Sequence, residues 1–200
     1  RVAIESLDPA VAAQLEASKI FCKNLLRQAD IATGDYHVFR DGPSAHRYIS
    51  ERYEDTQRCP VVVKADGLAA GKGVIVCSLR DEAIEAIDRI AGAREFGDAG
   101  NQLIIEEKLI GPEASVLAIT DGRTIVTLPP AQDHKPAFDG DKGPNTGGMG
   151  AYCPAPLVDD KMLAHIEEHV LVPTVHAMKR NRTPFRGVLY AGLMITNHGP

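Results

Sequence analysis

The sequence contains no tryptophan, few other aromatic residues and no long apolar run. Aromatic residues make up 5% of its 200 residues, so the stacking platforms that bind single-stranded nucleic acid are not expected. No apolar run approaches the roughly 18 residues that a membrane-spanning helix needs. The net charge of −5 also argues against general binding to nucleic acid or to a membrane surface. We therefore expect neither nucleic acid nor a membrane as a partner.

Cysteines are few and scattered. Cys22, Cys59, Cys77 and Cys153 are widely spaced and form no C-x-x-C pair. This spacing indicates reduced thiols rather than a disulfide framework or a zinc site. No secretory signal pattern opens the sequence, so a cytoplasmic protein is expected. With 44% hydrophobic residues, the chain is able to bury a core as one large domain or two small ones.

The sequence also lacks a Walker A loop, although residues 61–76 have the composition of a phosphate-binding loop. Gly67 and Gly71 are separated by three residues, one fewer than the motif requires, and Lys72 is followed by Gly73 instead of Ser or Thr. Two β-branched runs flank this loop, which is bare enough for backbone N–H groups to approach a polyphosphate. The segment favours a nucleotide triphosphate as ligand, and a tight hairpin with exposed lysines is the alternative.

Charged residues lie at the ends of two expected strands. Lys64 ends an apolar run, where an ammonium is costly unless it meets an anion such as a phosphate. Glu106 and Glu107 end the run 102–107, and Glu113 follows shortly after. The backbone at such a strand end is able to hydrogen-bond the edge of an adenine, and one carboxylate is able to accept from the adenine amino group. Glu113 is then a candidate to bind the ribose hydroxyls. Acids that only solvate a strand end are the alternative.

A long segment rich in Gly, Pro and Asp covers residues 132–156. Its stretch 143–150 contains Asn145 and Thr146 among glycines, which favours a cradle for an anion or a polar substrate. Asp133 and Lys135 are candidates to bind an amine and a phosphate. A flexible linker is the alternative, although loops of this length inside a globular chain are usually functional or disordered.

Apolar periodicity and turn residues predict an α+β chain in which helices and strands interleave. The turn at residues 41–44 and Ser78 are expected to begin helices as N-caps, and the last strand is expected to be buried. The expected helices cover residues 9–29, 44–53, 80–91 and 159–178, and the expected strands cover 36–39, 61–64, 73–77, 102–107, 113–120, 123–128 and 188–195.

Taken together, these segments resemble the phosphoribosylamine–glycine ligase family of ATP-grasp enzymes. The matching stretches occur in the same order as in the family, and the most specific of them is 143–152. The stretches are residues 14–19, 63–74, 95–100, 105–107, 132–135, 143–152 and 187–194. The resemblance implies an ATP-grasp fold with a small lid subdomain and a central mixed or antiparallel sheet subdomain with helices. The implied domains are an entering helix (1–34), the lid with its Gly-rich phosphate loop (35–107) and the central catalytic subdomain (108–200).

The same resemblance implies an activity and a set of site residues. The activity is ATP-dependent ligation of glycine to 5-phosphoribosylamine through a glycyl phosphate, which yields glycinamide ribonucleotide, ADP and phosphate in purine biosynthesis. The implied catalytic residues are Lys64 and Lys72. The implied ATP-binding residues are Lys19, Lys64, Gly67, Gly71, Lys72, Gly73, Glu106, Glu107, Leu109 and Glu113. The implied substrate-binding residues are Asp133, His134, Lys135, Asn145, Thr146, Gly147 and Gly148.

The implied cofactors are ATP and Mg²⁺ or Mn²⁺, and the implied assembly is a monomer or a weak homodimer. The family's metal ligands are expected just after Pro200, so no metal ligand is expected within these residues. The chain is therefore expected to be an internal piece that is inactive alone. Two alternatives stay open: another ATP-grasp carboxylate–amine ligase, and a nucleotide-binding module without catalysis.

Overall fold

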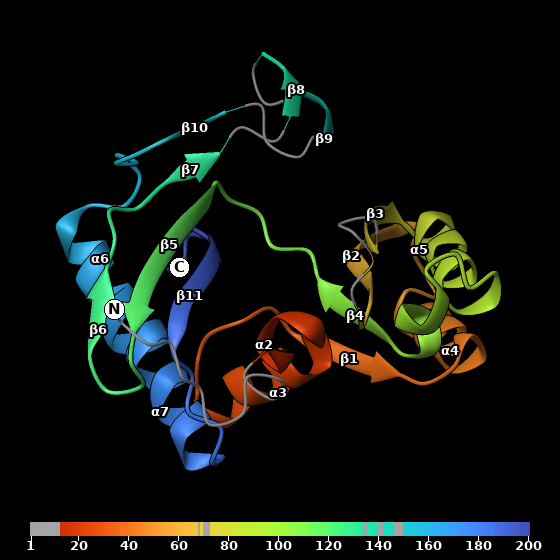
Figure 1. Ribbon diagram of the computed structural model, residues 1–200. Helices are drawn as coiled ribbons and strands as arrows, with labels where there is room; N and C mark the ends of the chain where they lie inside the picture. Colours follow the sequence, from red (N-terminus) through yellow and green to blue (C-terminus); the bar gives the residue numbers. More distant parts are fainter. Residues whose placement is uncertain (1–12, 68, 70–72, 134–135, 140–141, 146–149) are drawn as a thin grey trace. The chain divides into compact units, whose positions relative to one another are not determined.

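The computed structural model describes residues 13–67, 69, 73–133, 136–139, 142–145 and 150–200 (Figure 1). These residues form two compact units, each of which is described by itself. The amino-terminal unit contains residues 13–24 and 33–109, and the carboxy-terminal unit contains residues 25–32 and 110–200.

The amino-terminal unit is built on a four-stranded antiparallel sheet. Its strands are β1 (Tyr36–Phe39), β2 (Arg58–Ala65), β3 (Val74–Leu79) and β4 (Leu103–Glu107), in the order β1-β4-β2-β3. The β-branched run at residues 61–63 favours extended backbone, and β2 alternates buried and half-buried residues along this run. All four strands were expected from the sequence, and β2 begins three residues earlier than predicted.

Two helices cover one face of this sheet, α4 (Gly42–Arg52) and α5 (Arg80–Ile87), as Figure 1 shows. Their buried residues meet the buried face of β2, β3 and β4 in one core; its members include Ala45, Ile49, Val61, Val63, Cys77, Ala83, Ile87, Leu103 and Ile105. A cap was predicted within residues 41–44, and the structure identifies it as the Asp41 carboxylate, which accepts the Ser44 N–H at 2.7 Å. Two short helices follow α5, a π-helix (Asp88–Gly92) and a 3₁₀ helix (Gly97–Asn101).

The prediction that Ser78 caps α5 is wrong. Leu79 is the N-cap residue, and the Glu82 carboxylate accepts the N–H groups of Ser78 at 2.7 Å and Leu79 at 3.1 Å. The Ser78 hydroxyl instead accepts a hydrogen bond from Lys108 at 3.0 Å. A glutamate in the first helical turn reaches back to the free N–H groups and replaces the serine as the capping group.

The single helix predicted over residues 9–29 is, within the described residues, two helices, α2 (Gln14–Ala17) and α3 (Lys19–Gln28). Ser18 separates them with extended backbone angles, φ −130° and ψ 114°. Its hydroxyl accepts the Phe21 N–H at 3.0 Å, which begins α3 with a new cap. Apolar residues continue on both sides of Ser18, at Leu15 and Ile20, so the apolar pattern did not mark this break.

The carboxy-terminal unit contains a three-stranded antiparallel sheet, in the order β11-β5-β6. Its strands are β5 (Glu113–Thr120), β6 (Ile125–Thr127) and β11 (Gly187–Met194). The turn between β5 and β6 is held by the Asp121 carboxylate, which accepts the N–H groups of Arg123 and Thr124. A helical segment packs along this sheet (Figure 1) and consists of α6 (Asp160–Ile166), a π-helix (Glu167–Leu171) and α7 (Val172–Arg180).

Two expectations for this unit need correction. The strand 188–195 was predicted to be buried, but Val188 and Tyr190 are 55% and 57% exposed and alternate with the buried Leu189. The segment 132–156, predicted as a loop, carries short antiparallel pairs: β7 (Gln132–Asp133) with β10 (Ala151–Tyr152), and β8 (Pro136–Phe138) with β9 (Lys142–Asn145). Strands of two to four residues leave no periodic signal to detect in the sequence.

The predicted α+β class is confirmed, since helices pack on antiparallel sheets in both units. The four cysteines are free, as expected. Among the described residues, no helix is long and apolar enough to cross a membrane.

The core of the amino-terminal unit is expected to be sensitive to truncation at Ile49, which is fully buried. Ile49→Ala should lower the free energy of unfolding by about 2–5 kcal/mol, because it removes buried methyl groups and leaves a cavity. Ile110→Ala is the matched control, since Ile110 is 77% exposed; its effect should stay within about 0.5 kcal/mol. Denaturant unfolding measures both, and equal losses would contradict this packing.

The cysteines are expected to differ in reactivity. Burial raises the pKa of the Cys59 and Cys77 thiols to about 11, so only about one in a thousand of either is a thiolate near pH 8. Cys153 is exposed and should be alkylated first. Mass spectrometry of the native and guanidinium-unfolded protein measures this order, and native labelling of Cys59 as fast as that of Cys153 would contradict it.

Candidate functional site

The candidate site lies on the face of the amino-terminal sheet that α4 and α5 do not cover. In the antiparallel register, Glu106 of β4 is opposite Tyr36 of β1 and Val62 of β2, and Lys64 is opposite Ile104. Side chains two residues apart on a strand share a face, so Lys64 and Glu106 lie on the same side of the sheet. Glu106 is only 7% exposed, which is unusual for a carboxylate and indicates a paired charge.

The Glu106 carboxylate is held between two ammonium groups. Lys23 Nζ on α3 donates to Glu106 Oε1 at 2.5 Å, and Lys64 Nζ donates to Glu106 Oε2. Lys23 also donates to Thr33 Oγ1 at 2.5 Å, and its Nζ lies 5.5 Å from the centre of the Tyr36 ring. The structure therefore brings Lys64 and Glu106 together, as a common site requires, and adds Lys23 to them.

Lys19 lies one turn before Lys23 on α3 and contacts the start of the glycine-rich loop. Its Nζ donates to the Gly67 carbonyl at 3.0 Å and to the Asp66 carbonyl at 3.5 Å. Burial lowers the pKa of the Lys19 ammonium; the Asp66 carboxylate opposes this shift, and the Lys64 charge adds to it. The Lys23 pKa is also lowered by burial, against the opposing hydrogen bond and charge of Glu106.

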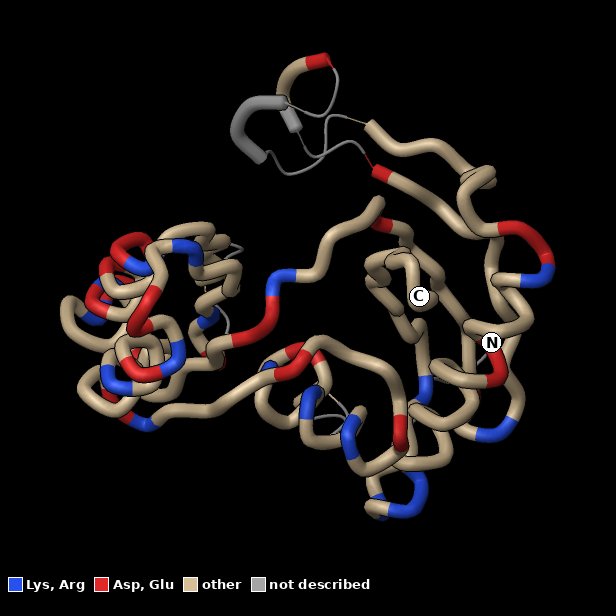
Figure 2. Tube along the Cα trace, turned by 180° about the vertical axis from the view of Figure 1, so that it is seen from behind, with Lys and Arg blue, Asp and Glu red and all other residues tan. Residues whose placement is uncertain are grey.

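The site thus gathers three ammonium groups, with the carboxylates of Glu106, Asp66 and Glu16 close to them. Lys19 donates to backbone carbonyls rather than to a carboxylate, so its charge is able to pair with an added anion. On helices α4 and α5, by contrast, basic and acidic residues are interspersed (Figure 2). Polyphosphate is the anion that fits a group of lysines beside a bare loop, because its charge is spread over several oxygens.

Asp66 attaches the loop to the beginning of α3. Its carboxylate accepts the Ile20 N–H at 2.8 Å and the Ser18 hydroxyl at 3.0 Å, and its carbonyl accepts the Lys19 N–H at 3.2 Å. An aspartate in this position caps the helix from a distant part of the chain. The cap holds the backbone of α3 next to the loop and so places the Lys19 side chain.

The described glycines of the loop are required by packing. A Cβ atom at Gly67 would lie 2.9 Å from Ala99, and one at Gly73 would lie 2.6 Å from the Ala69 side chain. The Gly67 N–H is directed to the Ala99 carbonyl at 3.4 Å, so it is not free for a phosphate in this conformation. Gly71 and Lys72, also predicted here, lie outside the described residues.

At the end of β4 the chain leaves the sheet and becomes more exposed to solvent. The Glu107 N–H donates to the Asp35 carbonyl at 2.8 Å, and the Lys108 N–H donates to the Pro60 carbonyl at 3.2 Å. Glu107 is exposed and Leu109 is half-buried. The predicted adenine contacts at Glu107 and Leu109 therefore lie directly after Glu106, where the chain leaves the sheet.

The remaining predicted residues belong to the carboxy-terminal unit or are not described. Glu113 begins β5, Asp133 ends β7 and Asn145 ends β9. Five predicted substrate residues lie outside the described residues: His134, Lys135, Thr146, Gly147 and Gly148. Within the part of the chain that the structure describes, no three His, Cys, Asp or Glu side chains gather closely enough to hold a metal ion.

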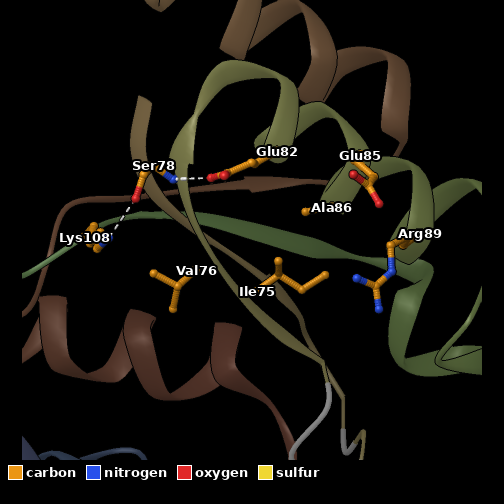
Figure 3. Close-up of a pocket in the computed structure, with 8 residues that line it drawn as sticks. All are labelled: Ile75, Val76, Ser78, Glu82, Glu85, Ala86, Arg89 and Lys108. Atoms are coloured by element: carbon orange, nitrogen blue, oxygen red, sulfur yellow. Dashed lines mark hydrogen bonds between the residues drawn. The ribbon is translucent and has the colours of Figure 1, made fainter. Parts of the chain in front are cut away.

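A depression beside β3 and α5 has most of its polar groups already paired (Figure 3). Ser78 bonds to both Glu82 and Lys108, and Arg89 donates two hydrogen bonds to the Glu95 carboxylate at 2.8 and 3.1 Å. These contacts pair Ser78, Glu82, Lys108 and Arg89 of this lining. The lysine group around Glu106 is therefore the stronger candidate for a ligand site.

Comparison with known proteins identifies the family. The family model described as "Phosphoribosylglycinamide synthetase, ATP-grasp (A) domain" matches residues 17–200. The chain belongs to this family. The predicted ATP-grasp fold is thereby confirmed, and a solved D-alanyl-alanine synthetase A from Vibrio cholerae shares the fold at 17% identity, with a TM-score of 0.69 over 94% of this chain and 53% of that chain.

Two relatives of this synthetase family are close in sequence. A phosphoribosylamine–glycine ligase from Rhodopirellula baltica is 70% identical over 190 residues, which are 94% of this chain and 44% of the relative. The crystal structure of phosphoribosylamine–glycine ligase from Thermotoga maritima is 32% identical with a TM-score of 0.81, over 95% of this chain and 47% of that chain. The chain thus spans about half the length of the relatives it matches.

Sequence reasoning did not identify Lys23, Thr33 and Asp66 as parts of this candidate site. A signal for Lys23 was present, because Lys19 and Lys23 are four residues apart and residues at this spacing share a helix face. Thr33 and Asp66 had no such signal, since their partners are distant in sequence.

The Asp66 cap is expected to stabilise the beginning of α3. Asp66→Ala removes the acceptor of the Ile20 N–H and should lower the free energy of unfolding by about 1 kcal/mol, with faster hydrogen exchange at that amide. Asp98→Ala is the control, because Asp98 is an exposed carboxylate of the same unit. Its effect should stay within about 0.5 kcal/mol; unchanged exchange at Ile20 in Asp66→Ala would contradict the assignment.

Proposed function

We propose that the protein containing this chain ligates glycine to 5-phosphoribosylamine at the expense of ATP, forming glycinamide ribonucleotide, ADP and phosphate. The observation that carries this proposal is the buried Glu106 carboxylate between Lys23 and Lys64, with Lys19 close by. The carboxylate is able to accept a hydrogen bond from an amino group, and the lysines are able to bind a polyphosphate. The two together suit a purine nucleotide such as ATP. Membership of the synthetase family supports the choice of the two co-substrates.

The reaction divides into two displacements. A carboxylate oxygen of glycine attacks the terminal phosphorus of ATP, and ADP leaves to give glycyl phosphate. The amine of 5-phosphoribosylamine then attacks the acyl carbon, phosphate leaves and the amine loses a proton. Lys64 and Lys72 act as the catalytic cations, because fixed positive charge stabilises the phosphoryl group as it transfers.

The nucleotide is bound mainly by the amino-terminal unit. Lys19 and the loop of Gly67, Gly71 and Gly73 bind the phosphates, and Glu106 accepts a hydrogen bond from the adenine amino group. The backbone from Glu107 to Leu109 contacts the ring, and Glu113 binds the ribose. Residues 35–107 act as a lid, residues 1–34 as the segment that enters it and residues 108–200 as the catalytic subdomain. Lid closure keeps water from the acyl phosphate.

The co-substrates are bound by the segment between β6 and α6. Its polar groups suit a small amine and a phosphate, and the residues proposed for this role are Asp133, His134, Lys135, Asn145, Thr146, Gly147 and Gly148. Mg²⁺ or Mn²⁺ is the proposed cation that accompanies ATP. The described residues present no group of three metal-ligating side chains, so no step is assigned to the cation. A cytoplasmic monomer or weak homodimer is proposed, which agrees with the free cysteines.

ATP binding is tested by the complete protein and its Lys64→Ala variant. ATP with Mg²⁺ at about 100 times its Kd should stabilise the wild type by roughly 2.7 kcal/mol, measured as a thermal shift. Lys64→Ala should lose most of this shift, and it should fold because Lys23 still pairs with Glu106. Lys161→Ala is the control, since Lys161 is an exposed lysine on α6. An equal shift in wild type and Lys64→Ala would refute the proposed phosphate site.

The reaction itself is tested by product analysis. With ATP, glycine and 5-phosphoribosylamine, the complete protein should form ADP, phosphate and glycinamide ribonucleotide in equal amounts. A different ligated amine would indicate another carboxylate–amine ligase. ATP binding without product would indicate a nucleotide-binding module that lacks catalysis.

A further inference from the structure

Lys23 is a buried ammonium that the proposed reaction does not use. Its side chain is 11% exposed, and an unpaired charge at this depth would be strongly unfavourable. It donates to Thr33 Oγ1 and to Glu106 Oε1, each at 2.5 Å, and lies over the Tyr36 ring. These contacts come from the segment before β1, from β1 itself and from β4. Lys23 is therefore fixed in place from several sides.

The two oxygens of Glu106 are in different surroundings. Oε1 faces Lys23 and is enclosed by Gly34, where an added Cβ would lie 3.2 Å from it. Oε2 pairs with Lys64, whose side chain is 23% exposed, about twice as accessible as that of Lys23. One oxygen thus has a fixed partner, and the other has a partner on the open side of the site.

This asymmetry matters if Lys64 moves to a phosphate. The ammonium would then leave Oε2, and the carboxylate would keep its orientation only through Lys23. An ionised carboxylate is purely an acceptor. A 6-amino purine donates to such an acceptor, whereas a 6-oxo purine presents its own acceptor and is repelled.

We propose that Lys23 is a positioning residue that holds the Glu106 carboxylate oriented, so that Oε2 selects a 6-amino purine nucleotide over a 6-oxo purine nucleotide. Lys64 is the exchangeable partner of Glu106, and Lys23 is the permanent one. This inference rests on the proposed function only in placing the nucleotide base beside Glu106.

The variant Lys23→Met separates this role from simple packing. Methionine has a similar length but no charge, so Glu106 would pair with Lys64 alone and would retain it against the phosphate. Selectivity for the base should fall because Oε2 stays occupied, and affinity for ATP should fall because Lys64 is held back. A residue that only packs would change stability and leave the base preference of the folded protein unaltered.

The measurement is the Kd of ATP and of inosine triphosphate by calorimetry, with the complete protein. The wild type should prefer ATP by about tenfold or more, as expected for one hydrogen bond to a charged group. In Lys23→Met the preference should fall to within about threefold, mostly through weaker ATP binding. Lys161→Ala, on the exposed side of α6, should keep the wild-type ratio.

Each outcome either supports or overturns the inference about Lys23. A wild type that binds ATP selectively, with an unchanged ratio in folded Lys23→Met, overturns the inference about Lys23 alone. A wild type that binds neither nucleotide overturns both this inference and the proposed function. If Lys23→Met does not fold, Thr33→Val removes only the second anchor of Lys23; a reduced ATP preference then supports the inference, and an unchanged one overturns it.

Discussion

The site depends on one interaction, the pairing of the buried Glu106 carboxylate with two ammonium groups. Removing a carboxylate from water is costly unless opposite charge and hydrogen bonds replace the solvent, and here Lys23 and Lys64 supply both. The pairing also explains why α3 begins in this unit. The helix brings Lys23 to the sheet, while Ser18 and Asp66 fix the point at which it begins. Lys23 and Lys64 thus join α3, β2 and β4 at Glu106, and Asp66 joins the loop to α3.

The two faces of the amino-terminal sheet have different roles: one packs into the core, and the other carries the candidate site. Residues at alternate positions of β2, such as Val61 and Val63, join the core under α4 and α5. Lys64, one position on, belongs to the opposite face and to the polar network. Because side chains alternate between the two faces of a strand, neighbouring residues of β2 contribute to the core on one face and to the site on the other. Substitutions in the core should mainly alter the free energy of unfolding, whereas substitutions around Glu106 should mainly alter ligand binding.

Several features were predictable from sequence because their causes are local. The β-branched run before the loop, the Asp41 cap and the Asp121 turn each depend on neighbouring residues, and each is present. Lys64 and Glu106 were predicted to share a site, and the structure brings them together. The errors have distant causes: Asp66 accounts for the helix break at Ser18, and Glu82 reaches back to replace Ser78 as the cap. The exposure of Val188 and Tyr190 depends on what packs on their sheet, which apolar content does not reveal.

The sequence by itself determined the α+β class, the order of the longer helices and strands, and the family, since these follow from periodicity and short motifs. Only the tertiary structure decided that Lys23 is buried against Glu106, that Asp66 caps α3, and that Gly67 and Gly73 are required by alanines packed against them. The reason is physical: burial and charge pairing are properties of groups that meet in space. Lys23 and Glu106 are 83 residues apart in the chain, and they meet because antiparallel strands and one helix bring them to the same face of a sheet.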